Sequence, residues 1–248
     1  MTFKDHFTTA ADAYASARPT YPPELFAWIA GHAPARGVAW DCATGNGQAA
    51  RDLARHFARV VATDASAGQI ARAPAVPGVE YRVATAERSG LPDRSAHAIT
   101  VAAALHWFDF DAFYSEARRV LVPGGLLVAW AYSGIRAGDA VNAAIGEYQA
   151  RYVGGYWPPE RRYVDERYET LPFPLREIAA PRLELRREYT MEELVGYLAS
   201  WSSTARYREA TGADPLPALR GLLAAAWGDP AARRPVSWAL HARAGYTD

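Results

Sequence analysis

The fold of this chain is predicted from the stretch Ala39-Trp-Asp-Cys-Ala-Thr-Gly-Asn-Gly-Gln-Ala-Ala50. The apolar run that begins at Val38 is typical of a buried strand, and apolar residues recur at helical spacing from Gln48 onward. Gly45 and Gly47 supply the unhindered backbone of a tight turn between them. The sequence therefore predicts a strand, a glycine turn, and a helix whose first N–H groups face a nucleotide-like ligand.

The spacing of this turn separates two kinds of nucleotide site. Dinucleotide dehydrogenases carry G-x-G-x-x-G, and this chain has no third glycine at that spacing. It reads Asp41-x-Ala43-x-Gly45-x-Gly47, which resembles the first motif of the class I S-adenosylmethionine (SAM) methyltransferases, D/E-x-G-x-G-x-G. The resemblance implies that the acid suits the ammonium end of SAM. Ala43 stands where that family usually has its first glycine, and a purely structural strand-to-helix turn is the alternative.

Length and composition narrow the class of protein. A chain of 248 residues suits one domain with a large core, and the single Cys42 excludes an intrachain disulfide or a cysteine-rich zinc site. The 27 basic and 27 acidic residues balance, so we expect no nucleic-acid or anionic-membrane partner. The first residues lack a signal-peptide pattern and no apolar run approaches membrane-spanning length, which predicts a cytoplasmic protein.

Residues 1–35 are expected to form an N-terminal cover of two helices. A cover of that kind lies over the ends of the strands, where Tyr14, Arg18 and Tyr21 would line the open side of the ligand. Arg18 would pair with the carboxylate of SAM. An exposed arginine at a helix end is the alternative.

An acid also ends the second expected strand. Residues 59–63 read as a buried strand, Asp64 follows them, and a helix begins near Ser66. An acid at the tip of the second parallel strand can accept hydrogen bonds from two ribose hydroxyls. A helix N-cap is the alternative for Asp64, but Ser66 also fits that position. We therefore expect Asp64 to hold the ribose of the cofactor.

The third expected strand, residues 80–83, leads into a candidate adenine site. Thr85, Ala86 and Glu87 follow this strand. The adenine amino group needs an acceptor, and its ring needs a backbone N–H donor. Related methyltransferases often have Asp where Thr85 stands, so the adenine contact stays open among these three residues.

His106 and Trp107 follow the central strand, which is expected over residues 97–104. A strand tip delivers side chains into the crevice where an α/β sheet binds ligands, so both should lie near the transferred methyl group. His106 is the best general-base candidate in the chain. Packing beneath a loop is the alternative for both, and Asp109 is expected to cap the next helix.

The rest of the chain contains a structural motif and an expected cap. Leu121-Val-Pro-Gly-Gly resembles the turn before the fifth strand of the same methyltransferase class. From residue 134 to 180 the alternation of strand and helix lapses and aromatic residues gather. Tyr156 and Trp157 stand there among arginines, a composition that holds a flat or anionic small molecule. A solvated loop with aromatic anchors is equally open.

Together these motifs resemble one branch of the class I enzymes, the trans-aconitate methyltransferase-like proteins. The resemblance implies an α/β, Rossmann-like fold: a seven-stranded, mostly parallel sheet whose last strand is antiparallel, with helices on both faces. It implies a single domain that spans residues 1–248. The core would cover about 36–133 and 181–248, and the inserted substrate cap about 134–180. Beyond the cap, residues 183–189 and 236–243 read as strands, and 191–202 and 215–227 as helices.

The resemblance also implies which positions bind ligands. The expected cofactor-binding residues are Tyr14, Arg18, Asp41, Ala43, Thr44, Gly45, Gly47, Gln48, Asp64, Ala65, Gln69, Thr85, Ala86, Glu87 and Ala103. The expected substrate-binding residues are Tyr21, Trp107, Tyr132, Tyr156 and Trp157, with His106 as the catalytic residue. The cofactor would be SAM, its product S-adenosylhomocysteine (SAH), with no metal.

The implied chemistry is in-line attack by an acceptor atom on the activated methyl group. A small molecule with a carboxylate is the first acceptor class, because a carboxylate needs no base. A hydroxyl or ring nitrogen comes second and would use His106. A SAM-binding scaffold or sensor without catalysis is the runner-up, and a nicotinamide dehydrogenase a distant third. The protein is expected to be a monomer or a homodimer.

Overall fold

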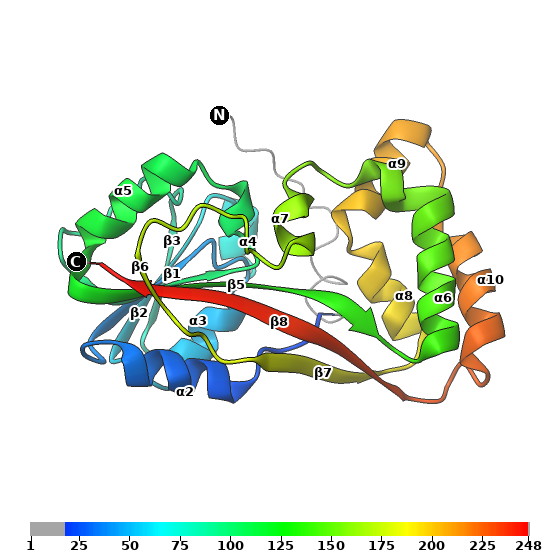
Figure 1. The fold of residues 1–248 in the computed structure, drawn as a ribbon, viewed down its shortest axis with the longest axis horizontal. Coiled ribbons are helices and arrows are strands. Elements are labelled where there is room, and N and C mark those ends of the chain that lie inside the picture. Colours follow the sequence, from blue (N-terminus) through cyan, green and yellow to red (C-terminus); the bar gives the residue numbers. More distant parts are fainter. Residues whose placement is uncertain (1–17, 248) are drawn as a thin grey trace.

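The computed structural model describes residues 18–247 and shows an α/β protein built on one central sheet (Figure 1). The first helix of the expected N-terminal cover, apart from Arg18 at its end, and the candidate residue Tyr14 lie outside the described residues. Within residues 18–247, no helix is both long and apolar enough to cross a membrane.

Strands and helices alternate through the first half of the described chain. The strands are β1 (Val38–Cys42), β2 (Arg59–Asp64), β3 (Val79–Val83), β4 (Ala96–Ala102), β5 (Leu121–Arg136), β6 (Arg176–Ile178), β7 (Leu183–Tyr189) and β8 (Arg234–Tyr246). The α-helices are α2 (Pro23–His32), α3 (Gln48–Leu53), α4 (Ala67–Ile70), α5 (Phe110–Val120), α6 (Asp139–Tyr148), α7 (Arg161–Asp165), α8 (Met191–Ala199), α9 (Ser202–Thr211) and α10 (Leu216–Trp227). Within residues 18–247, three helical segments are not α-helical: η2 (Leu105–Trp107), η3 (Gln149–Val153) and η4 (Gly154–Tyr156).

The sheet confirms the expected fold class. Five parallel strands run in the order β3-β2-β1-β4-β5, and β8 lies antiparallel beside β5. The described sheet has eight strands where seven were expected, because two short strands share its far edge. β6 pairs with residues 244–246 of β8, and β7 pairs with residues 234–240.

Each face of the sheet carries its own apolar core. On one face Leu25 of α2 and Leu53 of α3 belong to a single buried cluster. On the other face Phe113 of α5 packs in a second cluster with Trp40 and Cys42. Figure 1 shows α2 and α3 on one side of the sheet and α5 on the opposite side. Cys42 is a buried free thiol, which suits a small residue on a strand that is covered on both faces.

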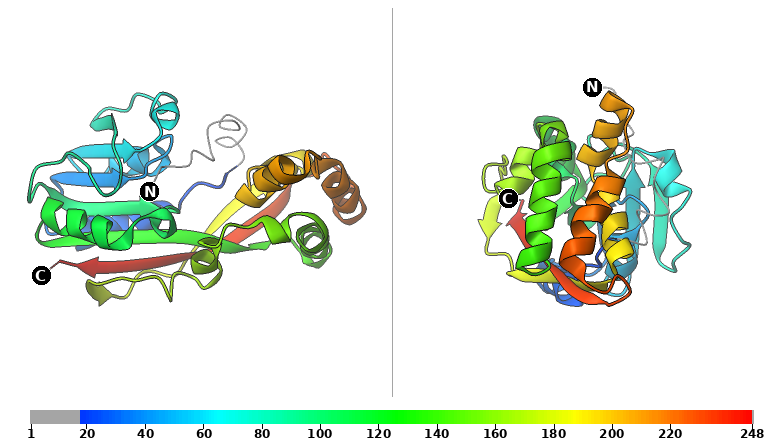
Figure 2. Two further views of the ribbon diagram at one scale, coloured as in Figure 1. Left: turned by 90° about the horizontal axis from the view of Figure 1, so that it is seen from above. Right: turned by 90° about the vertical axis from the view of Figure 1, so that its right-hand side faces the viewer.

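A second group of helices lies at the far end of β5, β7 and β8 (Figures 1 and 2). We call α6, η3, η4, α8, α9 and α10 the helical layer. Within it α6 and α8 both pack against α10, and α9 packs against η4. The layer draws α6 from the expected cap segment and α8 to α10 from residues 191–227. Helix α7 stands between this layer and the carboxyl ends of the parallel strands (Figure 1), and it contacts η2 and β5.

Candidate functional site

The turn after β1 has an unusual backbone that leaves room for a ligand. Ala43, Gly45 and Gly47 have φ angles of 54°, 58° and 84°, all left-handed. A Cβ on Gly47 would lie 2.4 Å from the hydroxyl of Tyr81, whereas a Cβ on Gly45 would meet nothing within 4 Å. At the end of β4, Ala103 is left-handed too, with φ 53°. Such conformations cost a non-glycine residue about 1–2 kcal/mol, and they cluster at functional sites.

Asp41 lies beneath this turn. Its side chain is 0% exposed, and its two oxygens accept hydrogen bonds from the hydroxyls of Thr44 at 2.5 Å and Thr100 at 2.7 Å. Burial raises the pKa of Asp41 to about 6, although both hydroxyls favour the ionised form. Asp41 therefore stabilises the turn through its hydrogen bond with Thr44. Its predicted effect on the ammonium group of SAM would act through Thr44 and through its charge.

Asp64 ties the tip of β2 to the glycine turn. Its Oδ2 accepts a hydrogen bond from the N–H of Gly45 and its Oδ1 one from the N–H of Ser66, both at 2.8 Å. Ser66 is the N-cap of α4 and accepts from the N–H of the buried Gln69, so the cap expected of Ser66 is confirmed. Ala65 lies half-buried between them. A carboxylate offers about four acceptor positions, so these two bonds are compatible with the predicted ribose role.

The expected adenine residues lie at the carboxyl end of β3. Thr85 is exposed, Ala86 is buried, and Glu87 is half-buried. Glu87 accepts a hydrogen bond from the N–H of Asp109 at 3.3 Å. Asp109 caps α5, which confirms the prediction that it is a helix cap. The structure thus places Glu87 between β3 and the start of α5, and the adenine contact stays a prediction.

His106 is buried behind the end of β4. It is 7% exposed, its Nδ1 lies 2.8 Å from the hydroxyl of Tyr168, and its ring centre lies 4.8 Å from that of Trp107. Burial, and then the positive charge of Arg161, lowers the pKa of His106 to about 3. The imidazole is therefore uncharged at neutral pH and has a low affinity for a proton.

The expected substrate-binding residues fall into two groups besides Trp107. The ring of Tyr21 is centred 5.3 Å from that of Trp130 and 6.4 Å from that of Tyr132, so Tyr21 packs against β5 beside Tyr132. Tyr156 and Trp157 lie in and beside the helical layer instead. Their nearest aromatic partners, with centroid distances, are Tyr207 at 5.2 Å and Trp201 at 5.3 Å. Tyr156 and Trp157 also line a surface pocket with Arg206 and Glu209 of α9.

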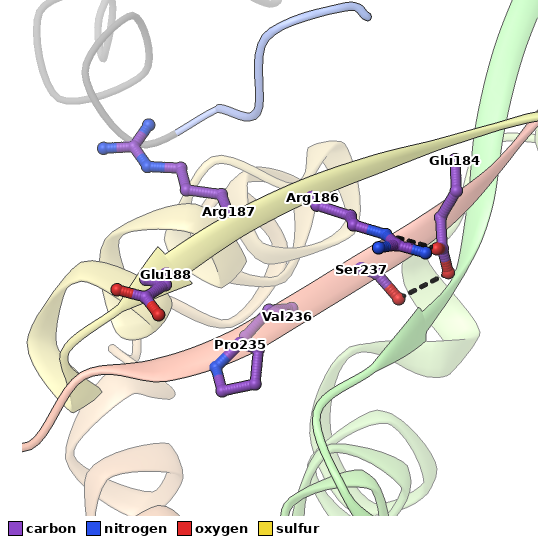
Figure 3. Close-up of a pocket in the computed structure, with 7 residues that line it drawn as sticks. All are labelled: Glu184, Arg186, Arg187, Glu188, Pro235, Val236 and Ser237. Atoms are coloured by element: carbon purple, nitrogen blue, oxygen red, sulfur yellow. Dashed lines mark hydrogen bonds and ion pairs between the residues drawn. The ribbon is translucent and has the colours of Figure 1, made fainter.

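The residues that precede α2 are bound at two points, one on α3 and one on β7. Gln48 Nε2 donates a hydrogen bond to the carbonyl of Pro19 at 2.9 Å, and Arg187 donates one to the carbonyl of Arg18 at 2.8 Å. Figure 3 shows Arg187 projecting from β7 toward this segment. The charge of Arg18 also acts on Tyr197 of the helical layer. Gln48 therefore positions the N-terminal segment beside the glycine turn, and the pairing of Arg18 with SAM stays a prediction.

Three side chains at the site were not singled out from the sequence. Thr100 could have been found, because it is the polar residue within the apolar run 98–102 and is in register with Asp41. Arg161 and Tyr168 lie within the segment rich in rings and arginines. No spacing in that segment linked either residue to His106, which is 62 positions away from Tyr168.

Known proteins share this arrangement over most of the chain. Residues 40–129 match the family described as methyltransferase domain. A methyltransferase of Dictyostelium discoideum is 34% identical over 91% of this chain and 87% of its own length. A solved structure described as a type II methyltransferase of Anaeromyxobacter dehalogenans is 44% identical, covers 92% of this chain and 97% of its own, and gives a TM-score of 0.85. The protein belongs to the class I SAM-dependent methyltransferases. This methyltransferase is also similar to an uncharacterised methyltransferase of Mycobacterium tuberculosis. The two are 33% identical over 88% of the present chain and 85% of the mycobacterial one.

The site of this methyltransferase fits SAM, the cofactor of its family. The turn exposes backbone where Gly45 leaves open space, and an acid stands at the tips of both β1 and β2. Among the described residues, no group of three His, Cys, Asp or Glu side chains is placed to hold a metal ion. When bound, SAM supplies a methyl group on a sulfonium, which is already a good leaving group. The comparisons confirm the resemblance to SAM methyltransferases that was drawn from Asp41-x-Ala43-x-Gly45-x-Gly47.

Proposed function

We propose that this methyltransferase methylates a carboxylate oxygen of a small-molecule acceptor and belongs to the trans-aconitate methyltransferase-like branch. One observation carries the choice of acceptor. His106 is buried, uncharged and poorly basic, and the positive charge of Arg161 acts on it. A site of this character suits an acceptor that arrives as an anion and has no proton to lose.

The proposed reaction balances without a base. A carboxylate oxygen attacks the methyl carbon as the carbon–sulfur bond breaks, and the electron pair of that bond stays on sulfur. The products are a methyl ester and SAH, so one negative and one positive charge are consumed together. Holding oxygen, carbon and sulfur in line can supply roughly 7–11 kcal/mol of the barrier. The aromatic rings of Trp107 and Tyr168 beside His106 would contribute by fixing the acceptor and excluding water.

A hydroxyl or ring-nitrogen acceptor fits less well. Moving a proton from a phenol of pKa about 10 to an imidazole of pKa about 3 is uphill by roughly 10 kcal/mol. A SAM-binding scaffold without catalysis has no support among the relatives, which are described as methyltransferases. We therefore keep hydroxyl and ring-nitrogen methylation as the second candidate.

The acceptor class is tested by a screen. Purified protein and SAM are incubated with matched sets of carboxylic acids, phenols and nitrogen heterocycles. SAH release is measured, and the products are identified by mass spectrometry. We expect methyl esters from carboxylic acids. A product methylated on a phenol oxygen or ring nitrogen, with none on a carboxylate, would replace this proposal by the second candidate.

The pH dependence of turnover should be flat near neutrality. Because the pKa of His106 is lowered to about 3, its neutral form persists at every pH above about 4. A carboxylate acceptor with an ordinary pKa of about 4 is almost fully ionised at pH 6 and above. We expect kcat/KM to vary less than about threefold between pH 6 and 9, and His106→Ala to retain the same flat profile. A rise of tenfold per pH unit would indicate that the enzyme must remove a proton from the acceptor.

The cofactor site is proposed to use the glycine turn, Asp64 and the segment 85–87. Replacing Asp64 with alanine should weaken SAH binding roughly 10- to 150-fold, because hydrogen bonds to a charged group contribute about 1.5–3 kcal/mol. Calorimetric titration measures this, with NAD as the negative control ligand. Asp93→Ala serves as the control variant because that carboxylate is exposed and pairs with Arg119. Equal SAH affinity in wild type and Asp64→Ala would remove the ribose role.

A further inference from the structure

Helix α7 brings one arginine to the boundary between the sheet and the helical layer. The helix contacts η2, which carries His106, and Figure 1 shows it facing the helical layer on its other side. Arg161 is the first residue of α7 and is partly buried, with 26% of its side chain exposed. The fold thus places a cation near the expected methyl-transfer point and not on an outer surface.

The guanidinium of Arg161 is held in a fixed orientation. Its carbon lies 4.2 Å from the ring centre of Trp157, and Trp157 packs in turn on Trp201. Its Nε donates to Asp165 at 2.8 Å, and residues 18–247 offer it no other hydrogen bond or ion pair. Asp165 is mostly exposed, so this pair contributes little to stability. Two terminal NH₂ groups therefore remain to bind a ligand, in the planar arrangement that matches a carboxylate.

The positive charge of Arg161 acts on residues on both sides of the boundary between the sheet and the helical layer. It helps to lower the pKa of the buried His106, second to burial itself. On the other side, burial raises the pKa of Tyr197, and the charges of Arg18 and Arg161 oppose that rise. A negative group placed among His106, Trp157 and Tyr197 would therefore meet a cation that is already oriented and partly desolvated.

We propose that Arg161, stacked on Trp157, binds an anionic group of the methyl acceptor and so determines which acceptors the enzyme takes. The anion it holds is distinct from the reacting oxygen, because a carboxylate engaged by a guanidinium is a poorer nucleophile. The acceptor class is accordingly one with a second anionic group beside the carboxylate that is methylated. This inference rests on the proposed carboxylate methylation.

The neighbouring Arg162 supplies a matched control. It carries the same charge, but it is exposed and stacks on Tyr163 at 4.7 Å from the ring centre. The variants are Arg161→Gln, Arg161→Lys and Arg162→Gln. The probes are the dicarboxylates from malonate to adipate, titrated calorimetrically into the SAH complex, with the corresponding diamides as uncharged controls.

We expect Arg161→Gln to weaken binding of the best dicarboxylate roughly 10- to 150-fold and to leave the diamide unaffected. Arg161→Lys should recover part of the loss, because lysine keeps the charge but not the planar pair of donors. Arg162→Gln and the affinity for SAH should stay within about twofold of wild type. Unchanged SAH affinity also shows that each variant is folded.

Three results would overturn the inference: equal dicarboxylate affinity in wild type and Arg161→Gln, an equal loss in Arg162→Gln, or no dicarboxylate binding by wild type.

Failure of the proposed carboxylate methylation would give a different result from failure of the anion site. If dicarboxylates bind through Arg161 but no methyl ester forms, the carboxylate reaction is wrong and the anion site stands. If esters form and Arg161→Gln leaves KM unchanged, the reaction stands and the anion site falls.

Discussion

Replacing Gly47 with alanine is expected to destabilise the folded protein by about 2–5 kcal/mol and to abolish measurable SAH binding. Two independent effects add at this position. The residue has φ 84°, which costs an alanine about 1–2 kcal/mol. Its new Cβ would also lie 2.4 Å from the Tyr81 hydroxyl and 2.8 Å from a ring carbon, so the ring must move. Urea unfolding at pH 7.5 measures the loss of stability.

Gly45→Ala separates the two effects at Gly47. Its φ is 58°, but a Cβ there meets nothing within 4 Å, so only the conformational cost applies. We expect Gly45→Ala to cost about 1–2 kcal/mol of stability. The double variant Gly47→Ala with Tyr81→Leu should recover the overpacking part of the loss, and a double-mutant cycle measures that coupling. If Gly47→Ala costs no more than Gly45→Ala, the contact with Tyr81 has no energetic weight.

Much of the parallel half of the sheet could be predicted from the sequence, because β1, β2 and β4 are buried, mostly apolar runs. Later elements were missed where sequence pattern and tertiary packing disagree. Helix α9 is mostly polar, with only Ser203 and Thr204 buried, so it shows no apolar stripe. The helix expected over residues 191–202 ends at Ala199 instead. β6 was missed too, because only three residues pair with β8.

The candidate site likewise contains residues that could be located from the sequence and residues that could not. Residues at strand tips, such as Asp41 and Asp64, could be located from spacing because parallel strands end at one edge of the sheet. The partners of His106 could not be located, since Tyr168 reaches it across 62 positions from a left-handed backbone with φ 63°. A contact of that kind depends on where α7 docks, and no local pattern encodes it.

Replacing Asp41 with asparagine is expected to stabilise the protein by about 3 kcal/mol at pH 8 and to leave its stability unchanged at pH 4. Burial raises the pKa of this carboxyl from 3.8 to about 6, and the charge of Asp64 adds to the rise. Asparagine resembles the protonated form in shape. Its amide can bond the same hydroxyls of Thr44 and Thr100, because a hydroxyl both donates and accepts.

The direction of the pH effect follows from the raised pKa. A group that binds its proton more tightly when folded contributes stability that is fully present below about pH 4, and this stability is lost as the pH rises through about 6. Glu80 and Glu116, whose pKa values are lowered to about 2, act in the opposite direction in the same experiment. Only the difference between wild type and Asp41→Asn isolates Asp41, so both are unfolded in urea at each half pH unit from 4 to 8.

Because the Asp41 carboxylate destabilises the fold at neutral pH, we expect its charge to act on the bound cofactor. SAM carries a sulfonium and an ammonium against one carboxylate, whereas SAH has lost the sulfonium charge. If the negative charge beneath the turn attracts the cofactor, Asp41→Asn should weaken SAM binding more than SAH binding, measured calorimetrically at pH 7.5. An equal loss for both ligands would mean that Asp41 acts through the geometry of the turn.

Thr100→Val is the matched variant, because it keeps the charge of Asp41 and removes one hydroxyl that bonds to it. It should lower stability at pH 8 by about 1–3 kcal/mol while retaining the preference for SAM. Opposite stability changes in these two variants, with the SAM preference lost only in Asp41→Asn, would identify the charge itself as the functional feature.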